Sequence, residues 1–121
     1  MTETQNPKQY DLEDRTYAFA RDVRVFVKGL KRTIANVEDG KQLVKASGSV
    51  GANYIEANEA LSKKDFLMRI RICRKESKEG RYWLRLVDTS DDEKLDIRRQ
   101  ELIQEVTELM SIFGSIVRKS E

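Results

Sequence analysis

Two pairs of glutamates have the spacing that a divalent metal site needs. Glu56 and Glu59 form the first pair, and Glu76 and Glu79 follow after sixteen intervening residues. Two carboxylates three positions apart share one face of a helix, and a hard cation such as Mg²⁺ takes oxygen ligands. If the two segments are neighbouring helices, these four side chains predict a magnesium site.

The arrangement is similar to that of all-α nucleotide pyrophosphohydrolases of the MazG type, in which E-x-x-E on one helix and E-x-x-D on the next hold magnesium against a triphosphate. Two features depart from that pattern, because Glu79 stands where it has aspartate and Glu59 falls at or beyond the end of its helix. The sequence also lacks histidine, which removes ordinary Ser-His-Asp and Cys-His catalysts. We therefore expect no catalytic site, no metal and no other cofactor, with a magnesium-dependent nucleoside triphosphate pyrophosphohydrolase as the alternative.

A row of basic residues could bind phosphates. Segment 62–88 contains nine Lys and Arg against four Asp and Glu. Some of the basic residues recur at spacings of three or four, so that they fall within about 80° of one another on a helix. This basic ridge consists of Arg71, Arg74, Lys78, Arg81 and Arg85. At about 1.5 Å per residue the ridge runs for roughly 20 Å, long enough to contact several phosphates of a nucleic acid.

The charges of the ridge could instead be neutralised within the protein. Segment 89–121 contains eight Asp and Glu against five Lys and Arg. Its acids, or those of a neighbouring subunit, could pair with the ridge, and exposed pairs of that kind contribute little to stability. The candidate acids are Asp96, Glu101, Glu105 and Glu108. The sequence leaves nucleic-acid binding and pairing as alternatives.

The opposite flank of the same segment places two carboxylates between large apolar side chains. This mixed flank consists of Arg69, Ile72, Glu76, Glu79 and Trp83. Aromatic and arginine residues are concentrated at protein interfaces, and a carboxylate buried there needs a positive or hydrogen-bonding partner. We predict a subunit interface on this flank.

A polar line marks the segment before it. Ser49, Asn53 and Glu56 share one face of a helix, opposite Val50 and Tyr54. The line is either a solvated hydrogen-bond network or a second contact surface of an assembly. The sequence does not separate these two interpretations.

These residues require helices to position them. Apolar periodicity predicts helices over 11–34, from about 41 to 59, over 62–88 and over 93–118, with a turn at 36–40. Ser62 is expected to cap the third helix, and Cys73 to fill the core. Small residues in the second and third helices predict that these two pack closely. Short connections predict an all-α, antiparallel up-down-up-down four-helix bundle, with a flexible tail at 1–10 and a single domain over 11–118.

The middle of the chain resembles a known bacterial family. Residues 47–86 read SGSVGANYIEANEALSKKDFLMRIRICRKESKEGRYWLRL. This run, within a match from Tyr10 to about Val117, resembles the four-helix-bundle proteins related to 23S rRNA intervening sequences. It resembles more distantly the accessory variability proteins of diversity-generating retroelements. The family signature Ser-x-x-x-Asn-x-x-Glu matches the polar line, with Ala57 in place of the usual glycine.

The resemblance implies a homo-oligomer, since members of the family form closed, typically pentameric, rings of bundles. As partners we expect structured RNA or DNA, or an RNA-handling enzyme such as a reverse transcriptase. No apolar stretch is long enough to span a membrane, and a single cysteine excludes an intrachain disulfide. We therefore expect a cytoplasmic, non-catalytic binding or accessory protein, or a pure protein scaffold.

Overall fold

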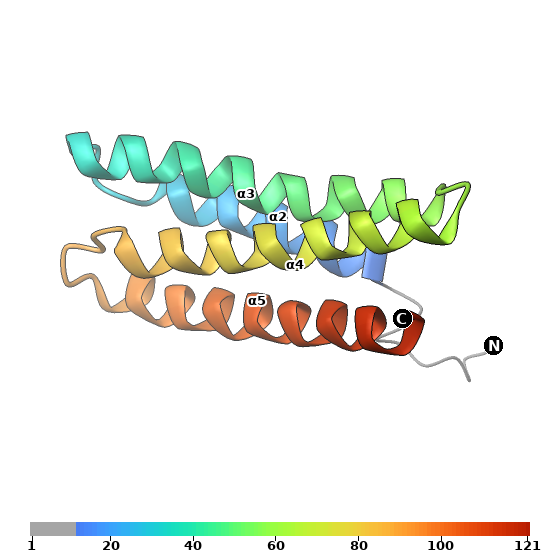
Figure 1. Cartoon of the computed structure of the whole chain (residues 1–121). Coiled ribbons are helices and arrows are strands. Elements are labelled where there is room, and N and C mark those ends of the chain that lie inside the picture. Colours follow the sequence, from blue (N-terminus) through green and yellow to red (C-terminus); the bar gives the residue numbers. More distant parts are fainter. Residues whose placement is uncertain (1–11) are drawn as a thin grey trace.

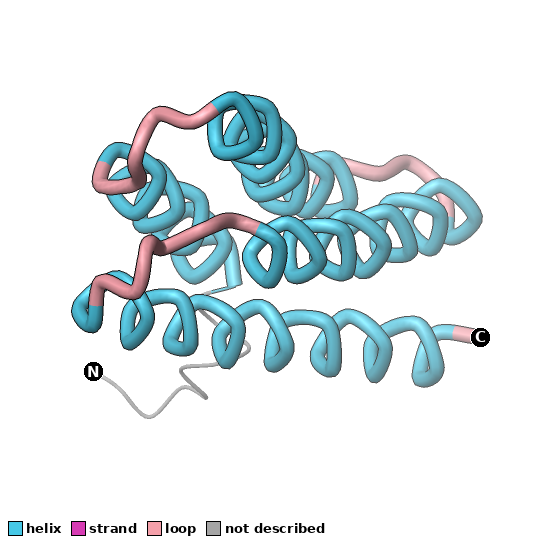
Figure 2. The backbone as a smooth tube through the Cα atoms, turned by 90° about the vertical axis from the view of Figure 1, so that its left-hand side faces the viewer, coloured by secondary structure: helices cyan, strands magenta, loops and turns pink. Residues whose placement is uncertain are grey.

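The computed structural model describes residues 12–121, which form four α-helices. These are α2 (Leu12–Lys28), α3 (Ile34–Asn58), α4 (Lys63–Leu86) and α5 (Glu93–Ser120). No strand occurs in this part of the chain, so the predicted all-α four-helix bundle is confirmed. Each helix runs in the opposite direction to the one before it (Figure 1). The α2–α3 and α4–α5 loops therefore share one end of the bundle, which faces the viewer in Figure 2.

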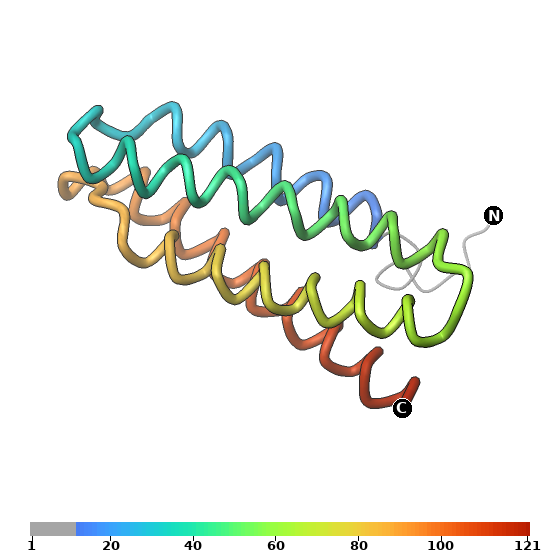
Figure 3. The backbone as a smooth tube through the Cα atoms, turned by 45° about the horizontal axis from the view of Figure 1, so that its top comes forward, coloured from blue at the N-terminus to red at the C-terminus, as the bar shows by residue number. Residues whose placement is uncertain are grey.

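Each helix packs against two neighbours. Extensive contacts join α2 to α3, α3 to α4, α4 to α5, and α5 back to α2. As a result, α4 lies between α3 and α5, and α5 lies between α4 and α2 (Figure 3). The two flanks of α4 and the two flanks of α5 are therefore distinct environments.

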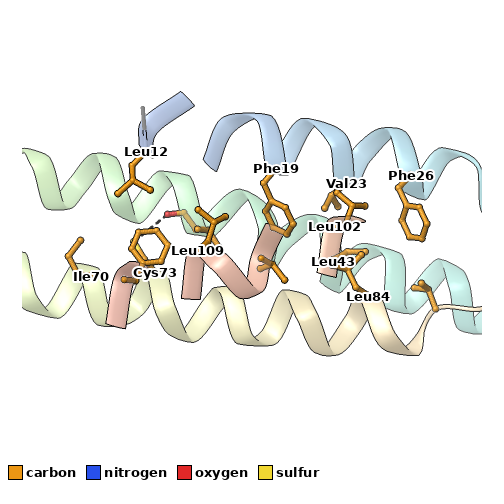
Figure 4. Packing of buried hydrophobic residues seen from close by; sticks show 14 of the residues in the cluster. Leu12, Phe19, Val23, Phe26, Leu43, Ile70, Cys73, Leu84, Leu102 and Leu109 are labelled. Atoms are coloured by element: carbon orange, nitrogen blue, oxygen red, sulfur yellow. Dashed lines mark hydrogen bonds between the residues drawn. The ribbon is translucent and has the colours of Figure 1, made fainter. Parts of the chain in front are cut away.

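The core lies between the four helices and follows the apolar stripes of the sequence. Phe19, Val23 and Phe26 of α2 point inward, where they meet Leu43 of α3 and Leu84 of α4 (Figure 4). From α5 the inward residues are Leu102, Val106, Leu109, Phe113 and Val117. Each large apolar side chain that is fully buried stabilises the fold by about 1.5–3 kcal/mol relative to its exposed state.

The predicted boundary between the first two helices is wrong. Helix α2 ends at Lys28, and the predicted turn at 36–40 lies inside α3. Two side chains explain the difference: Thr33 caps α3, and Asn36 forms hydrogen bonds to both neighbouring loops. The Thr33 side chain accepts a hydrogen bond from the Asn36 backbone N–H at 3.1 Å, so the helix begins before the predicted turn. The predicted tail at 1–10 and the predicted helix start at Asp11 lie outside the described residues.

Asn36 is buried because it joins the two loops at one end of the bundle. Its Nδ2 donates to the carbonyl oxygens of Lys31 and Asp88 at 3.0 and 2.9 Å. Its Oδ1 accepts from the Asp88 backbone N–H at 2.9 Å. The sequence suggested that Asn36 is a turn residue, but its side chain instead connects the two loops by hydrogen bonds.

The sequence suggested that the glycines of α3 allow close packing against α4, but they lie against α2. A Cβ on Gly51 would lie 3.0 Å from Thr16 Oγ1, and one on Gly48 would lie 3.3 Å from Arg24 Nη2, and both neighbours belong to α2. A Cβ on Gly80 of α4 would meet nothing within 4 Å. The missing side chains of α3 therefore admit α2 rather than α4. At the start of α4, Ser62 accepts from the Asp65 N–H at 3.1 Å, which confirms the predicted cap.

Candidate nucleic-acid interface

The basic ridge lies on the side of α4 that borders α5. Arg81 Nη1 donates to Thr107 Oγ1 at 3.4 Å, and Arg71 Nη2 donates to Glu121 Oε2 at 2.7 Å. Arg74 lies between these two points and passes over Gly114 of α5. Arg81 is half-buried and the other ridge residues are exposed. The predicted helical face is therefore a continuous edge of the groove between α4 and α5.

Between Gln100 and Arg118, the side of α5 that faces the ridge carries no carboxylate. Thr107 and Gly114 locate this side, because both contact the ridge. Residues at helical spacing from them share the same face. We call this set the polar strip: Gln100, Gln104, Thr107, Ser111, Gly114 and Arg118. The groove is therefore bordered by cations on α4 and by amides, hydroxyls and a further arginine on α5.

The acids of α5 are engaged elsewhere, so their predicted pairing with the ridge is wrong. Glu105 and Glu108 accept from Arg15 Nη2 of α2 at 2.7 and 3.1 Å. Helical geometry explains this choice, because both glutamates lie on the flank of α5 that faces α2. The other two candidate acids bind arginines of their own helix: Glu101 pairs with Arg98 at 2.7 Å and Asp96 with Arg99 at 3.2 Å.

Most of the ridge therefore has no counter-charge within the part of the chain that the structure describes. Within residues 12–121, Arg71 is the ridge member that forms an ion pair, with Glu121. Arg74, Lys78, Arg81 and Arg85 form none there. Four cations thus stand in a row without an ion pair to any described carboxylate.

The mixed flank and the polar line meet on the other side of α4, against α3. Arg69 Nη1 donates to Asn53 Oδ1 at 3.0 Å, and Asn53 Nδ2 donates to Ser49 Oγ at 3.0 Å. Arg69 Nε lies 3.9 Å from Asp65 Oδ1 without a hydrogen bond. The two surfaces that the sequence suggested separately are thus one network that joins α3 to α4. Glu56 is exposed and takes no part in it.

The rest of the mixed flank combines apolar surface with a carboxylate, Glu76, whose pKa is raised. Burial raises the pKa of Glu76, and the nearby charge of Glu79 raises it further. Trp83 packs on the core, and its ring meets that of Tyr82 edge-on at a centroid distance of 5.0 Å. Toward the two ends of α4, Met68 and Leu86 are each nearly half exposed. The predicted subunit interface on this flank stays a prediction.

The four glutamates of the suggested magnesium site do not converge. Among the residues that the structure describes, no group of three or more carboxylates, histidines or cysteines could hold a metal ion. The antiparallel register explains this. Arg69 lies opposite Asn53, so Glu56 and Glu76 lie on opposite sides of that contact, about 15 Å apart along the axis at 1.5 Å per residue. The magnesium-site hypothesis is wrong.

Cys73 lies in the core, as the sequence predicted. Its Sγ donates to the Val50 carbonyl at 3.4 Å. Burial raises the pKa of its thiol to about 12. Since the thiolate is the reactive form, this cysteine is not a nucleophile at neutral pH.

The sequence reasoning found the ridge but missed Arg118. This residue stands in the last turn of α5, outside the segment that carries the excess of basic residues. Projection of α5 at 100° per residue would have placed it on the same face as Thr107 and Gly114. Counting charges by segment did not reveal Arg118, because the segment that contains it is acidic overall.

Comparisons with known proteins agree on one family. The profile of the family described as "23S rRNA-intervening sequence protein" matches residues 8–115. A crystal structure from Bacteroides thetaiotaomicron, described as a protein with unknown function from the S23 ribosomal protein family, is 27% identical, with a TM-score of 0.75. The match covers 87% of this chain and 96% of that chain. No curated protein matches the sequence. Within the described residues, no helix is long and apolar enough to cross a membrane.

Proposed function

We propose, from the premise that this chain belongs to the 23S rRNA-intervening sequence protein family, that it is a non-catalytic accessory protein that binds structured RNA through the groove between α4 and α5. One observation carries the proposal. Within residues 12–121, Arg74, Lys78, Arg81 and Arg85 form no ion pair, and the side of α5 that faces them carries no carboxylate between Gln100 and Arg118. The retroelement resemblance and the cytoplasmic location stay predictions.

Unpaired cations in a row repel one another, and a polyanion removes that repulsion. A nucleic acid whose phosphates approach the ridge also releases condensed counterions, which drives association at low salt. The ridge is straight because it follows one helix, and successive members lie about 5 Å apart along the axis. One strand of a nucleic acid can therefore follow the groove with several of its phosphates beside cations.

The polar strip favours RNA over DNA. Gln100, Gln104 and Thr107 are exposed beside the ridge, and amide and hydroxyl groups can both donate to and accept from a ribose 2′-hydroxyl, the group that DNA lacks. The name of the family also associates its members with an intervening sequence of 23S rRNA. Tyr82, exposed at the outer edge of the ridge and braced by Trp83, is available to stack on an unpaired base.

Self-assembly is part of the proposal. The mixed flank presents Ile72, Glu76 and Trp83 beside the exposed Met68 and Leu86. A second subunit that supplies a positive or donor group would relieve the carboxylate and cover the apolar surface. A homo-oligomer, with a pentameric ring as the form that the resemblance implies, would multiply the groove and convert modest affinity per site into avidity.

Light scattering tests the assembly. Trp83→Ala is expected to reduce the mass of the particle from an oligomer to smaller species, because it removes the largest side chain of the mixed flank. Tyr17→Ala, which removes an exposed aromatic on α2, is the control and should leave the mass unchanged. An unchanged mass in Trp83→Ala would remove the mixed flank from the interface.

Fluorescence anisotropy tests the function. Labelled structured RNA, single-stranded DNA and duplex DNA of equal length are titrated with the protein at about 50 mM salt, where phosphate contacts are strong. The expected result is saturable binding, tightest for the structured RNA. Equal affinity for DNA would transfer the proposal to nucleic acid in general. No binding of any probe would overturn it and leave a protein partner, such as an RNA-handling enzyme, as the occupant.

A further inference from the structure

Two arginines from different helices converge over one glycine of the groove. A Cβ on Gly114 of α5 would lie 3.3 Å from Nη1 of Arg118 and 3.8 Å from Nη1 of Arg74. The two guanidinium nitrogens are therefore no farther apart than the sum of these distances. Arg74 belongs to the basic ridge on α4, whereas Arg118 is one turn beyond Gly114 on α5.

Nothing within the described part of the chain neutralises this pair. Arg74 and Arg118 form no ion pair with any residue of 12–121. The carboxylate on the same side of the groove, that of Glu121, is bound to Arg71 at 2.7 Å. Two positive charges held this close without a counter-charge are unfavourable, unless an anion from outside the chain lies between them.

The absence of a side chain at position 114 leaves room for both arginines above α5. Gly114 is buried in a helix, where glycine costs about 1 kcal/mol relative to alanine. No glycine in the described residues has a positive φ angle, so the backbone conformation does not require glycine here. What the position lacks is a Cβ, and a Cβ would lie within 3.8 Å of both guanidinium groups.

We infer that Arg74 and Arg118 form a subsite over Gly114 for a single phosphate group. Each guanidinium can donate to a different oxygen of one phosphate, at the roughly 2.8 Å typical of charge-assisted bonds. The inference rests on the proposed function, because the phosphate is that of a nucleic-acid strand in the groove. The subsite fixes the register of that strand by clamping one phosphate from both sides, whereas Lys78 and Arg85 contact the strand from α4 alone.

Two probes of different size separate the subsite from the groove. Inorganic pyrophosphate, titrated by calorimetry, is small enough to occupy the subsite alone, while labelled structured RNA, titrated by anisotropy, needs the whole groove. Arg118→Gln removes one half of the clamp. Arg85→Gln is the matched control, because it removes the same charge from an exposed ridge position away from Gly114.

Arg118→Gln is expected to weaken binding of pyrophosphate and of RNA about tenfold each, since one charge-assisted contact is lost. Arg85→Gln should weaken RNA binding but leave pyrophosphate binding unchanged. Gly114→Ala should weaken pyrophosphate binding because its methyl group enters the subsite, and its helical circular dichroism should match that of the parent protein.

The outcomes distinguish the two proposals. If Arg118→Gln and Arg85→Gln weaken pyrophosphate equally, or neither does, the subsite is wrong even if RNA binds. If pyrophosphate binding depends on Arg118 but no RNA binds, the subsite stands as a site for a free phosphate compound and the proposed function fails. Loss of both probes in Arg118→Gln, with pyrophosphate retained in Arg85→Gln, supports the subsite as part of an RNA groove.

Discussion

The two flanks of α5 receive arginines from neighbouring helices in opposite ways. On the α2 side, Arg15 of α2 is bound by Glu105 and Glu108. In the same groove Arg98 of α5 itself pairs with Asp22 of α2 at 3.1 Å. The hydrogen bond to Glu105 is the main reason that the pKa of Arg15 is raised above its ordinary value. On the α4 side, Arg74 and Arg81 meet a glycine and a threonine.

This difference separates cations that hold the bundle together from cations that are available to a partner. The middle of α5 directs carboxylates toward α2 and none toward α4, where the ion pair of Glu121 with Arg71 lies at the end of the helix. A basic residue on a helix surface is therefore uninformative until its neighbours are known. The contrast between the α2–α5 and α4–α5 grooves is the basis for our proposal that the basic ridge binds a ligand.

The largest effect is expected when the α4–α5 groove is reversed in charge. Arg74→Glu, Lys78→Glu and Arg81→Glu together should weaken RNA binding at least about a hundredfold, because several phosphate contacts become repulsive. The helical circular dichroism should not change. The matched control reverses three exposed cations of α2 (Arg21, Arg24 and Lys28). An equal loss of binding in that control would show that only net charge matters.

A smaller effect is expected when the α4–α5 groove is converted into a copy of the α2–α5 groove. Thr107→Glu with Ser111→Glu places carboxylates opposite the ridge, where they pair with Arg81 and Lys78. RNA binding should fall about tenfold, because pairing neutralises two contacts, and stability should not fall. Thr107→Gln with Ser111→Gln is the neutral control of similar size. If the glutamate and glutamine variants bind RNA alike, unpaired charge is not what makes the groove a binding surface.

The positions of the helices could be predicted well because buried residues on a helix recur every three or four positions. The stripe of Phe19, Val23 and Phe26 on α2 is buried at the spacing that a helix requires. The boundary near Asn36 could not be predicted in the same way, because the asparagine's side chain binds a loop that lies 52 residues away in the sequence. Long-range hydrogen bonds of this kind leave no local pattern.

The candidate site was predicted only in part, for a related reason. Helical geometry at 100° per residue brought the ridge residues onto one face, but it could not say which acids of α5 face them. That depends on how α5 is rotated between its neighbours, which turns Glu105 and Glu108 toward Arg15. The contact of Arg69 with Asn53 depends likewise on the register of α3 against α4.

The α2–α5 groove should lose stability where the α4–α5 groove does not. Arg15→Gln is expected to lower the free energy of unfolding by about 1 kcal/mol, because the side chain is only 14% exposed and binds two carboxylates. Arg74→Gln should change it by less than about 0.5 kcal/mol. Urea denaturation of both variants makes the comparison. Equal losses would contradict the division between structural and available arginines.

The smallest effect is expected on the mixed flank, where two like charges meet. Glu76→Gln should raise the free energy of unfolding by less than about 0.5 kcal/mol at pH 7, because burial and Glu79 disfavour the charged form. The pKa of Glu76 is raised in the folded state. The parent protein is therefore less stable than the variant by the full amount above that pKa. This loss of stability disappears as the pH falls below 4.5, the ordinary pKa of a glutamate. Urea denaturation across this pH range measures the difference in free energy of unfolding between the variant and the parent protein. A difference that grows as the pH falls would contradict the prediction.

The central claim is that the unpaired cations of the α4–α5 groove bind the phosphates of RNA. The most direct test is the slope of the logarithm of the association constant against the logarithm of salt concentration, measured for the parent protein and for the Arg74→Glu, Lys78→Glu, Arg81→Glu variant. With the four unpaired ridge cations and Arg118 in contact, a slope of about −4 is expected for the parent protein, and no measurable binding for the variant. Binding that ignores salt, or a slope that survives the reversal, would contradict the claim.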